Sequence, residues 1–450
     1  MSKITFINHS SVLTEDNGTK ILCDPWFKGT AFQDGWSLLH ENSHNINEID
    51  FNYIWISHEH PDHFSIATLL DINKPTTFLY QETKDKKVKN FLEKKGHAVI
   101  ELKDSCPTVI DDTEVTLFMS DGYDSALLFR FSDGKTFLNF NDARIDLDNG
   151  INRVKSIFPE QIDLIGVQYS YASWAGNSDD DKTPNILQNH ADIKNTLIFE
   201  KLRPKSLMIF ANFVYFSHEE NFYWNKRNWL PHVVEKLTFE DCKLIVPHPD
   251  QEIELEGIEN AYFDESNSKA LNFWEEKISM IEIRTHIKPP RKINEITSQY
   301  NEFFDGLWKE NDIKLIKNKF NKNFNLNILV NDLNISIKIF LFEKKITVND
   351  YKEDFDCKLS SETLIFLLKN KFARGTVTIN SRIELNYENA HKLFIFFYIF
   401  YKNNIGVYVK NNFEALKELK SIQNTAVMSS IFRINKKAFS NFEKDLELFN

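Results

Sequence analysis

The chain has 450 residues, which is long for one domain and favours two or three. Hydrophobic residues make up 42% of it, enough for a sizeable core, and the net charge of −11 argues against a nucleic-acid-binding surface. The four cysteines are far apart and form no C-x-x-C pair, so the sequence predicts neither a disulfide framework nor a cysteine zinc site.

The sequence also lacks the signals of a membrane or secreted protein. Residues 1–6 carry no apolar signal-peptide region, and the longest apolar run, residues 393–401, is too short to cross a bilayer. We therefore expect a cytoplasmic protein without a membrane span that acts on a small molecule, and the sequence leaves homo-oligomerisation open.

The first elements are predicted to be short strands joined by polar turns. Residues 4–7, 12–13 and 20–23 have strand character, with a turn at residues 16–18. His9 lies between the first two strands, where a capping or core histidine and a histidine at the rim of a site fit the pattern equally well.

An apolar strand, residues 53–56, leads directly into the motif H-x-H-x-D-H, whose ligand-type residues are His58, His60, Asp62 and His63. Imidazole and carboxylate groups suit zinc and iron. His58 and His60 alternate off the strand end, and the other two follow on a turn, so the motif can serve two ions a few Å apart. That arrangement is typical of metal-assisted attack by hydroxide. The alternative is a surface cluster of polar residues.

Strands and helices alternate after this motif, which predicts a layered α/β fold. Helices are predicted over residues 64–70 and 83–95, and strands over residues 77–80, 98–100, 114–119, 126–131 and 136–140.

Three motifs together resemble the metallo-β-lactamase superfamily: HSS at residues 9–11, DPW at residues 24–26, and the histidine motif at residues 58–63. Residues 24–41, with the run GWSLLHE at their end, are more closely similar to the hydrolase-fold part of the CMP-N-acetylneuraminate hydroxylase family. The resemblance covers roughly residues 1–250. It implies an αββα sandwich, which we expect over residues 1–285.

The resemblance also implies two further metal ligands. Asp142 follows the strand at residues 136–140, where the superfamily has a ligand aspartate. The superfamily pattern expects a histidine before this hairpin, but none occurs between His97 and His190. The hydroxylase-like pattern has an aspartate at Asp124, and Asp121 lies close by. A carboxylate in place of an imidazole favours iron or manganese over zinc.

The last ligand predicted from the resemblance is His218, because the hydroxylase family has a histidine at a similar offset after a matching alanine. His248, in a Pro-His-Pro context, is the competing candidate. Before them come a strand at residues 162–167, a helix at residues 185–202 and a strand at residues 206–210. The aromatic loop at residues 168–177 is either a substrate-facing loop or a packed one.

The chain changes character after residue 285. We expect a helical linker over residues 286–322 and an α+β domain over residues 323–450, weakly similar to sterol-carrier-protein-like domains. Such a domain could bind an apolar tail or pair subunits. Two strands are predicted within residues 326–348, a helix at residues 360–368, a strand at residues 375–380 and a helix at residues 388–401.

These features favour a metal-dependent hydrolase with one or two divalent ions of zinc, iron or manganese. Hydroxide formed at the metal attacks an ester, phosphoester or lactone. The catalytic candidates are Asp62, His9 and His218, of which the two histidines could carry the proton.

Two alternatives remain. The hydroxylase resemblance implies an iron-dependent oxygenase that acts on a sugar or nucleotide-sugar. The sequence has no pair of C-x-H and C-x-x-H elements, so no Rieske iron–sulfur domain is predicted, and an oxygenase would need a separate electron-donor protein. The other alternative is a non-catalytic binding protein stabilised by metal, although structural zinc sites are usually closed and rich in cysteine.

Overall fold

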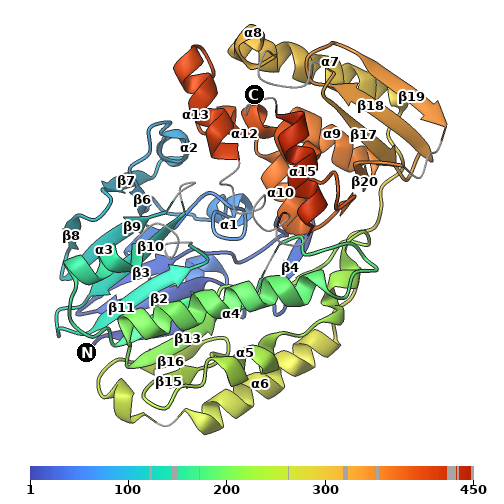
Figure 1. The fold of residues 1–450 in the computed structure, drawn as a ribbon. Coiled ribbons are helices and arrows are strands. Elements are labelled where there is room, and N and C mark those ends of the chain that lie inside the picture. Colours follow the sequence, from blue (N-terminus) through green and yellow to red (C-terminus); the bar gives the residue numbers. More distant parts are fainter. Residues whose placement is uncertain are drawn as a thin grey trace. The chain divides into compact units, whose positions relative to one another are not determined.

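The computed structural model describes residues 1–120, 124–143, 150–171, 173–261, 263–317, 323–350, 354–422, 432 and 435–446 (Figure 1). The chain divides into two compact units. The first unit comprises Met1–Ala172 and Gln188–Thr285, and the second comprises Ser173–Leu187 and His286–Asn450. The chain therefore passes from one unit to the other three times.

The first unit contains two seven-stranded sheets. One sheet has the order β16-β1-β2-β3-β5-β6-β7. The pairs from β16 to β3 are antiparallel, and the pairs from β3 to β7 are parallel. The strands are β1 (Lys3–Asn8), β2 (Ser11–Asp16), β3 (Thr19–Cys23), β5 (Tyr53–Trp55), β6 (Thr77–Gln81), β7 (Ala98–Leu102) and β16 (Gln251–Glu254).

The second sheet has the order β15-β13-β12-β11-β10-β9-β8. Strands β11, β12, β13 and β15 run parallel, and the others are antiparallel hairpins. The strands are β8 (Pro107–Ile110), β9 (Thr113–Met119), β10 (Ser125–Arg130), β11 (Thr136–Asn141), β12 (Leu164–Gln168), β13 (Ser206–Phe210) and β15 (Lys243–Ile245). A smaller two-stranded sheet pairs β4 (Trp36–Leu38) with β14 (Val214–Phe216).

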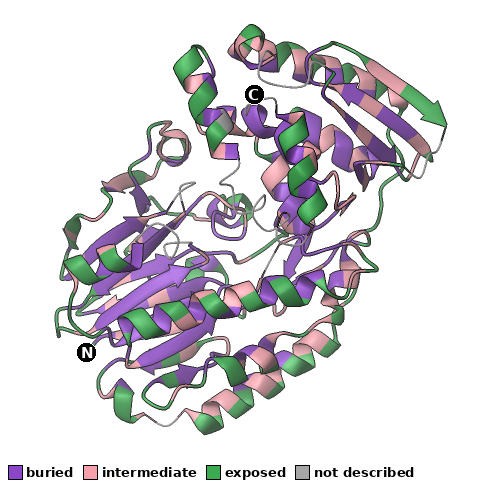
Figure 2. Ribbon diagram, viewed as in Figure 1, coloured by how far each residue is buried: buried purple, intermediate pink, exposed green. Residues whose placement is uncertain are grey.

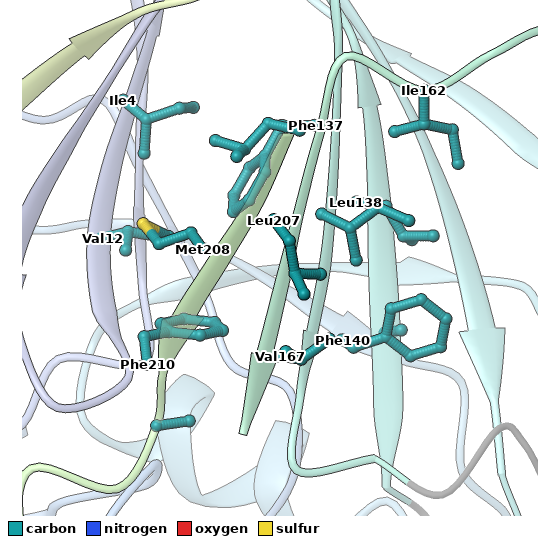
Figure 3. Packing of buried hydrophobic residues seen from close by; sticks show 14 of the residues in the cluster. Ile4, Val12, Phe137, Leu138, Phe140, Ile162, Val167, Leu207, Met208 and Phe210 are labelled. Atoms are coloured by element: carbon teal, nitrogen blue, oxygen red, sulfur yellow. The ribbon is translucent and has the colours of Figure 1, made fainter. Parts of the chain in front are cut away.

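The two large sheets share one hydrophobic core, to which both contribute side chains, such as Ile4 and Val12 from the first and Phe137 and Met208 from the second (Figure 3). All six residues of β11 are buried, which is typical of a strand covered on both faces. Gly166 in β12 makes room for this packing, because a Cβ there would come within 2.8 Å of the Phe210 ring.

Helices cover the outer faces of the two sheets. Val88 and Leu92 of α2 (Lys87–Lys94) and Leu69 of α1 (Ile66–Leu69) pack on the first sheet. Buried residues of α3 (Gly150–Ile157), α4 (Thr183–Leu202), α5 (Leu230–Lys236) and α6 (Asp264–Ser279) belong to the central core. Figure 2 shows buried strands and helices such as α4 and α6 with one exposed face. The predicted αββα sandwich is confirmed.

The second unit contains a five-stranded sheet of order β19-β18-β17-β20-β21 with helices. The strands are β17 (Asn325–Val330), β18 (Ile335–Phe340), β19 (Ile346–Asp350), β20 (Cys357–Leu359) and β21 (Glu384–Leu385). The helices are α7 (Ile293–Glu310), α8 (Ile313–Lys317), α9 (Ser361–Lys369), α10 (Ala373–Asn380), α11 (His391–Phe396), α12 (Tyr398–Asn404), α13 (Asn412–Ile422) and α15 (Lys436–Asp445). The Ser360 side chain caps α9 by accepting the N–H of Thr363.

One prediction for this unit was wrong, and two were incomplete. Residues 375–380 form helix α10, because the buried residues Ala373, Thr376, Val377 and Asn380 repeat with helical rather than strand spacing. The helix predicted at residues 388–401 is two helices, α11 and α12. The alternating segment at residues 326–348 contains the start of a third strand, β19, besides β17 and β18.

The aromatic loop at residues 168–177 is a packed loop in its second half. Trp174 is buried and its backbone N–H donates to the carbonyl of Thr378. The Asn177 side chain donates to the carbonyl of Leu385 and accepts the N–H of the same residue. Among the helices of the described residues, none is long and apolar enough to cross a membrane.

Candidate metal centre

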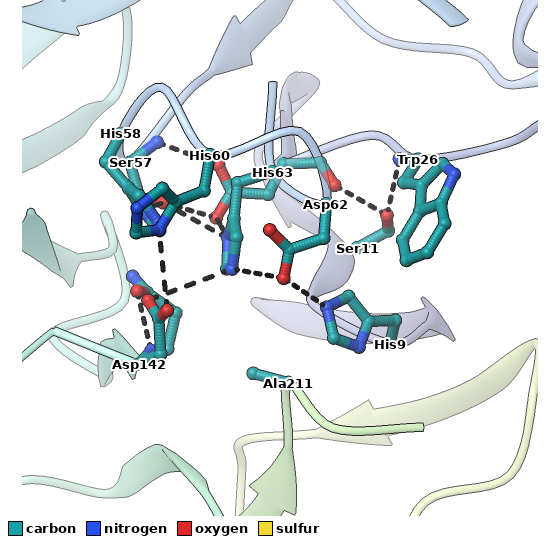
Figure 4. Close-up of polar contacts among 12 residues, drawn as sticks. His9, Ser11, Trp26, Ser57, His58, His60, Asp62, His63, Asp142 and Ala211 are labelled. Carbon is teal, nitrogen blue, oxygen red and sulfur yellow. Dashed lines mark hydrogen bonds and ion pairs between the residues drawn. The ribbon is translucent and has the colours of Figure 1, made fainter. Parts of the chain in front are cut away.

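The histidine motif occupies the loop that follows β5, at the carboxyl end of a parallel strand. The loop turns sharply because the N–H groups of His63 and Phe64 both donate to the carbonyl of His60. Asp142 follows β11 in the other sheet, and His9 follows β1. Figure 4 shows the side chains of these segments pointing toward one another.

The first group of candidate ligands is His58, His60 and Asp142. The Nε2 atom of His58 lies 2.8 Å from Nδ1 of His60 and 3.7 Å from Oδ2 of Asp142. One ligand atom from each residue lies within 4.8 Å of the others, so the three atoms can share one ion.

The second group is His9, Asp62 and His63. Oδ2 of Asp62 lies 3.3 Å from Nε2 of His9 and 3.4 Å from Nε2 of His63. Asp142 reaches this group too, since its Oδ1 lies 3.8 Å from Nε2 of His63. The two oxygens of Asp142 therefore face different groups, as a bridging carboxylate would.

The buried polar atoms fit bound metal ions. Among the described residues, no hydrogen-bond partner reaches Asp62 Oδ1, His63 Nε2 or Asp142 Oδ1, although all three atoms are buried. A buried polar atom without a partner is costly, and a divalent ion would satisfy these atoms. Imidazole and carboxylate donors suit zinc, iron and manganese.

Protonation in the metal-free protein differs between the histidines. Burial lowers the pKa of His9, His58 and His60, so these rings are neutral, which is the form that binds metal. Burial also acts on His63, but Asp62, Asp142 and Asp24 raise its pKa well above the ordinary value. These three carboxylates thus favour the protonated form of His63 in the metal-free protein.

Asp24 and Ser57 hold two of the rings. Asp24 is fully buried, and its Oδ1 accepts the Ser57 N–H at 2.7 Å. Its Oδ2 accepts the Ser57 hydroxyl at 2.7 Å and lies 2.9 Å from Nδ1 of His63. The Ser57 hydroxyl oxygen is also 2.9 Å from Nδ1 of His58. Such contacts orient the opposite nitrogen of each ring toward a metal. The sequence showed Asp24 only as part of the DPW motif.

Changing Asp24 to Asn should weaken metal binding roughly 10–100-fold, the usual effect of losing an outer partner of a ligand. An amide cannot accept from the Ser57 N–H, the Ser57 hydroxyl and His63 together. Chelator competition would measure the affinity. Asp16→Asn is the matched control, because Asp16 is a buried carboxylate of the same sheet that accepts from Ser132 and Thr113 instead. Equal affinities in both variants would contradict the role of Asp24.

A strained turn forms one side of the first group. Phe32, Gln33 and Asp34 have φ values of 50°, 56° and 61°, a left-handed run that non-glycine residues seldom adopt. The Gly35 N–H donates to the Phe32 carbonyl, and the Ser217 N–H donates to the Gly35 carbonyl. The Phe32 ring lies edge-on to His60, with centroids 5.7 Å apart. The turn thus buries the outer face of a candidate ligand.

Asp124 and His218, both predicted as ligands, lie outside the two groups. Asp124 precedes β10, and burial together with Asp142 raises its pKa to about 7 against the opposing effect of His60. Nδ1 of His218 accepts the Glu220 N–H at 3.1 Å. His248 is also outside the groups, with its Nδ1 2.9 Å from the Pro249 carbonyl. Asp121 lies outside the described residues.

At the end of β13 a methyl group faces the two groups. Ala211 faces His9 and Asp142 in Figure 4. Its φ is 54°, and its N–H donates to the His9 carbonyl at 2.7 Å. This strand end therefore presents no donor side chain at that point.

Comparison with known proteins agrees with this fold. Residues 3–122 match the family model described as a beta-lactamase superfamily domain. Cytidine monophosphate-N-acetylneuraminic acid hydroxylase of Danio rerio is 33% identical over 97 residues, which are 21% of this chain and 16% of that protein. A protein of Mycolicibacterium smegmatis named as a Rieske 2Fe-2S iron–sulfur protein is 32% identical over 188 residues, 38% of this chain and 35% of that one.

Among solved structures, a possible metal-dependent hydrolase from Veillonella parvula DSM 2008 aligns with a TM-score of 0.43 and 13% identity, over 56% of this chain and 99% of that one. The matched stretches of the two sequence relatives span about a sixth and about a third of their lengths.

The first unit has the αββα sandwich of the metallo-β-lactamase fold. More particularly, residues 3–122 carry a β-lactamase superfamily domain, and the relatives include CMP-N-acetylneuraminate hydroxylases. The resemblance predicted from the sequence motifs is confirmed.

Proposed function

We propose that the chain is a metal-dependent hydrolase that cleaves an ester, phosphoester or lactone bond of a small polar substrate. The observation that supports this best is Asp142, whose two oxygens face two separate groups of ligand atoms. Divalent zinc, iron or manganese bound at such groups supplies a water of lowered pKa and polarises the bond under attack.

The residues of the chain have distinct tasks in this proposal. His58, His60 and Asp142 would hold one ion, Asp62 and His63 would hold another, and Asp142 faces both groups. Burial alone would raise the pKa of Asp62, but His63 and His9 hold it well below its usual value. Asp62 is therefore a carboxylate at neutral pH, which is the form that would bind a metal ion.

Anaerobic turnover tests the hydrolase. The full-length protein, loaded with zinc or manganese, should hydrolyse members of a panel of esters, phosphodiesters and lactones without oxygen. Its His60→Ala variant should lose this activity together with metal. Absence of anaerobic turnover in a fully metal-loaded protein would overturn the proposal and favour either an oxygenase or a metal-stabilised binding protein.

An iron-dependent oxygenase is the second candidate, and Asp124 favours it, because its carboxyl interacts electrostatically with the first group. Burial and Asp142 raise the pKa of Asp124, and His60 lowers it. A carboxylate next to imidazole ligands suits iron. The relative from Danio rerio is named as a hydroxylase. As an oxygenase, this chain would act on a sugar or nucleotide-sugar and would receive electrons from a separate protein. Oxygen consumption that requires both iron and a reductant would identify this activity.

A further inference from the structure

The unusual backbone of His9 needs an explanation. His9 is buried, with 1% of its surface exposed, and adopts a left-handed φ of 46°. Residues with a side chain seldom adopt this conformation unless their surroundings enforce it, and such residues gather at functional sites. The Asn8 side chain accepts the His9 N–H at 2.9 Å, and the His9 carbonyl accepts the Ala211 N–H at 2.7 Å.

The ring of His9 is held in one orientation. Its edge meets the face of Trp26 at 90°, with centroids 5.5 Å apart, and it lies 5.8 Å from the His63 ring. Nε2 therefore points to Oδ2 of Asp62, at 3.3 Å (Figure 4). The strained backbone and the packed ring together aim one nitrogen at the point that Asp62 and His63 also face.

We propose that His9 is the third protein ligand of a second metal ion, together with Asp62 and His63, and that Asp142 bridges this ion to the first. This inference rests on the proposed metal-dependent function. The sequence analysis gave His9 a place at the rim of the site or a role in carrying the proton, whereas this inference makes it a ligand. His9 thereby takes the ligand position that was predicted for His218.

Two observations favour a ligand over a histidine that merely donates a hydrogen bond. Such a bond to Asp62 would leave Nε2 of His63 and Oδ1 of Asp62 buried without hydrogen-bond partners among the described residues, whereas one ion could contact all three side chains. The strand end facing the same point carries only the methyl group of Ala211. His9, from the first sheet, is thus the side chain that brings a third ligand atom to Asp62 and His63.

Metal counting on the full-length chain tests this inference. His9→Asn is the best variant, because Asn tolerates left-handed backbone better than most residues and keeps a polar side chain. His218→Ala is the matched control, since His218 is a histidine with the same 1% exposure outside both groups. Circular dichroism checks that each variant folds, and cobalt(II) titration with elemental analysis counts the ions.

We expect the parent and His218→Ala to bind two ions, and His9→Asn to keep one tightly and bind the other at least about 10-fold more weakly. Two ions with unchanged affinities in His9→Asn would overturn the inference, as would loss of an ion in His218→Ala alone. The hydrolase proposal fails separately, if the parent binds two ions but turns over nothing without oxygen.

Discussion

Changing Asp142 to Ala is expected to remove a ligand from both metal groups at once. Oδ2 of this residue faces His58 and Oδ1 faces His63, so the substitution deprives each ion of an oxygen. The bound metal should fall from two equivalents to one or fewer. Activity should fall by more than the roughly 10–100-fold that loss of an outer-shell partner causes. Elemental analysis and initial-rate measurements on the same preparations would give both numbers.

Asp163→Ala separates this effect from the general effect of removing a buried carboxylate. Asp163 lies just before β12 in the same sheet and accepts from the backbone and side chain of Thr136. Its loss should lower stability while both ions remain bound. Full metal content in Asp142→Ala would remove the bridging role and leave two independent sites or a single one.

Changing Trp274 to Ala is expected to lower the free energy of unfolding of the first unit by about 3–5 kcal/mol, the usual effect of truncating a fully buried tryptophan. Trp274 of α6 is fully buried and stacks on Phe213, with centroids 4.0 Å apart. Its indole N–H donates to the Pro247 carbonyl at 2.7 Å. Urea unfolding followed by circular dichroism would measure the change.

Trp274→Phe provides the comparison, because it keeps most of the stacked area and loses the hydrogen bond. That loss should cost about 1 kcal/mol. Phe213 lies two residues after Ala211, which faces the metal groups. By stacking on Phe213, Trp274 supports this stretch of backbone. Equal stability of the parent and Trp274→Ala would show that the loop after β13 is held by other contacts.

The part of the site that the sequence predicted is the part that is local. His58, His60, Asp62 and His63 lie within six residues at the end of an apolar strand, so their proximity needs no knowledge of the tertiary fold. The fold class followed from alternating strands and helices and from the resemblance. The strand predicted at residues 375–380 is helix α10 in the structure. A short apolar run fits both the strand and the helix period, and only packing decides between them.

The rest of the site depends on contacts between distant segments. His9 is 53 residues from Asp62, and Asp24 is 39 residues from His63. Sequence spacing does not encode these distances, since they follow from the order of strands in the first sheet and from the left-handed backbone at His9 and Asp24. His218 was predicted from its offset after an alanine, and in the structure it lies outside both groups, with the Glu220 N–H donating to its Nδ1.

Because the chain passes three times between the two units, the first unit cannot be produced by a single truncation. A gene shortened after Thr285 would still encode residues 173–187, whose partners lie in the second unit. Trp174 would lose Thr378 and Tyr387, and Asp180 would lose the Tyr387 hydroxyl. A stable first unit therefore requires two changes: truncation after Thr285 and replacement of residues 173–187. A chain that keeps only the first unit therefore needs a different segment between β12 and α4.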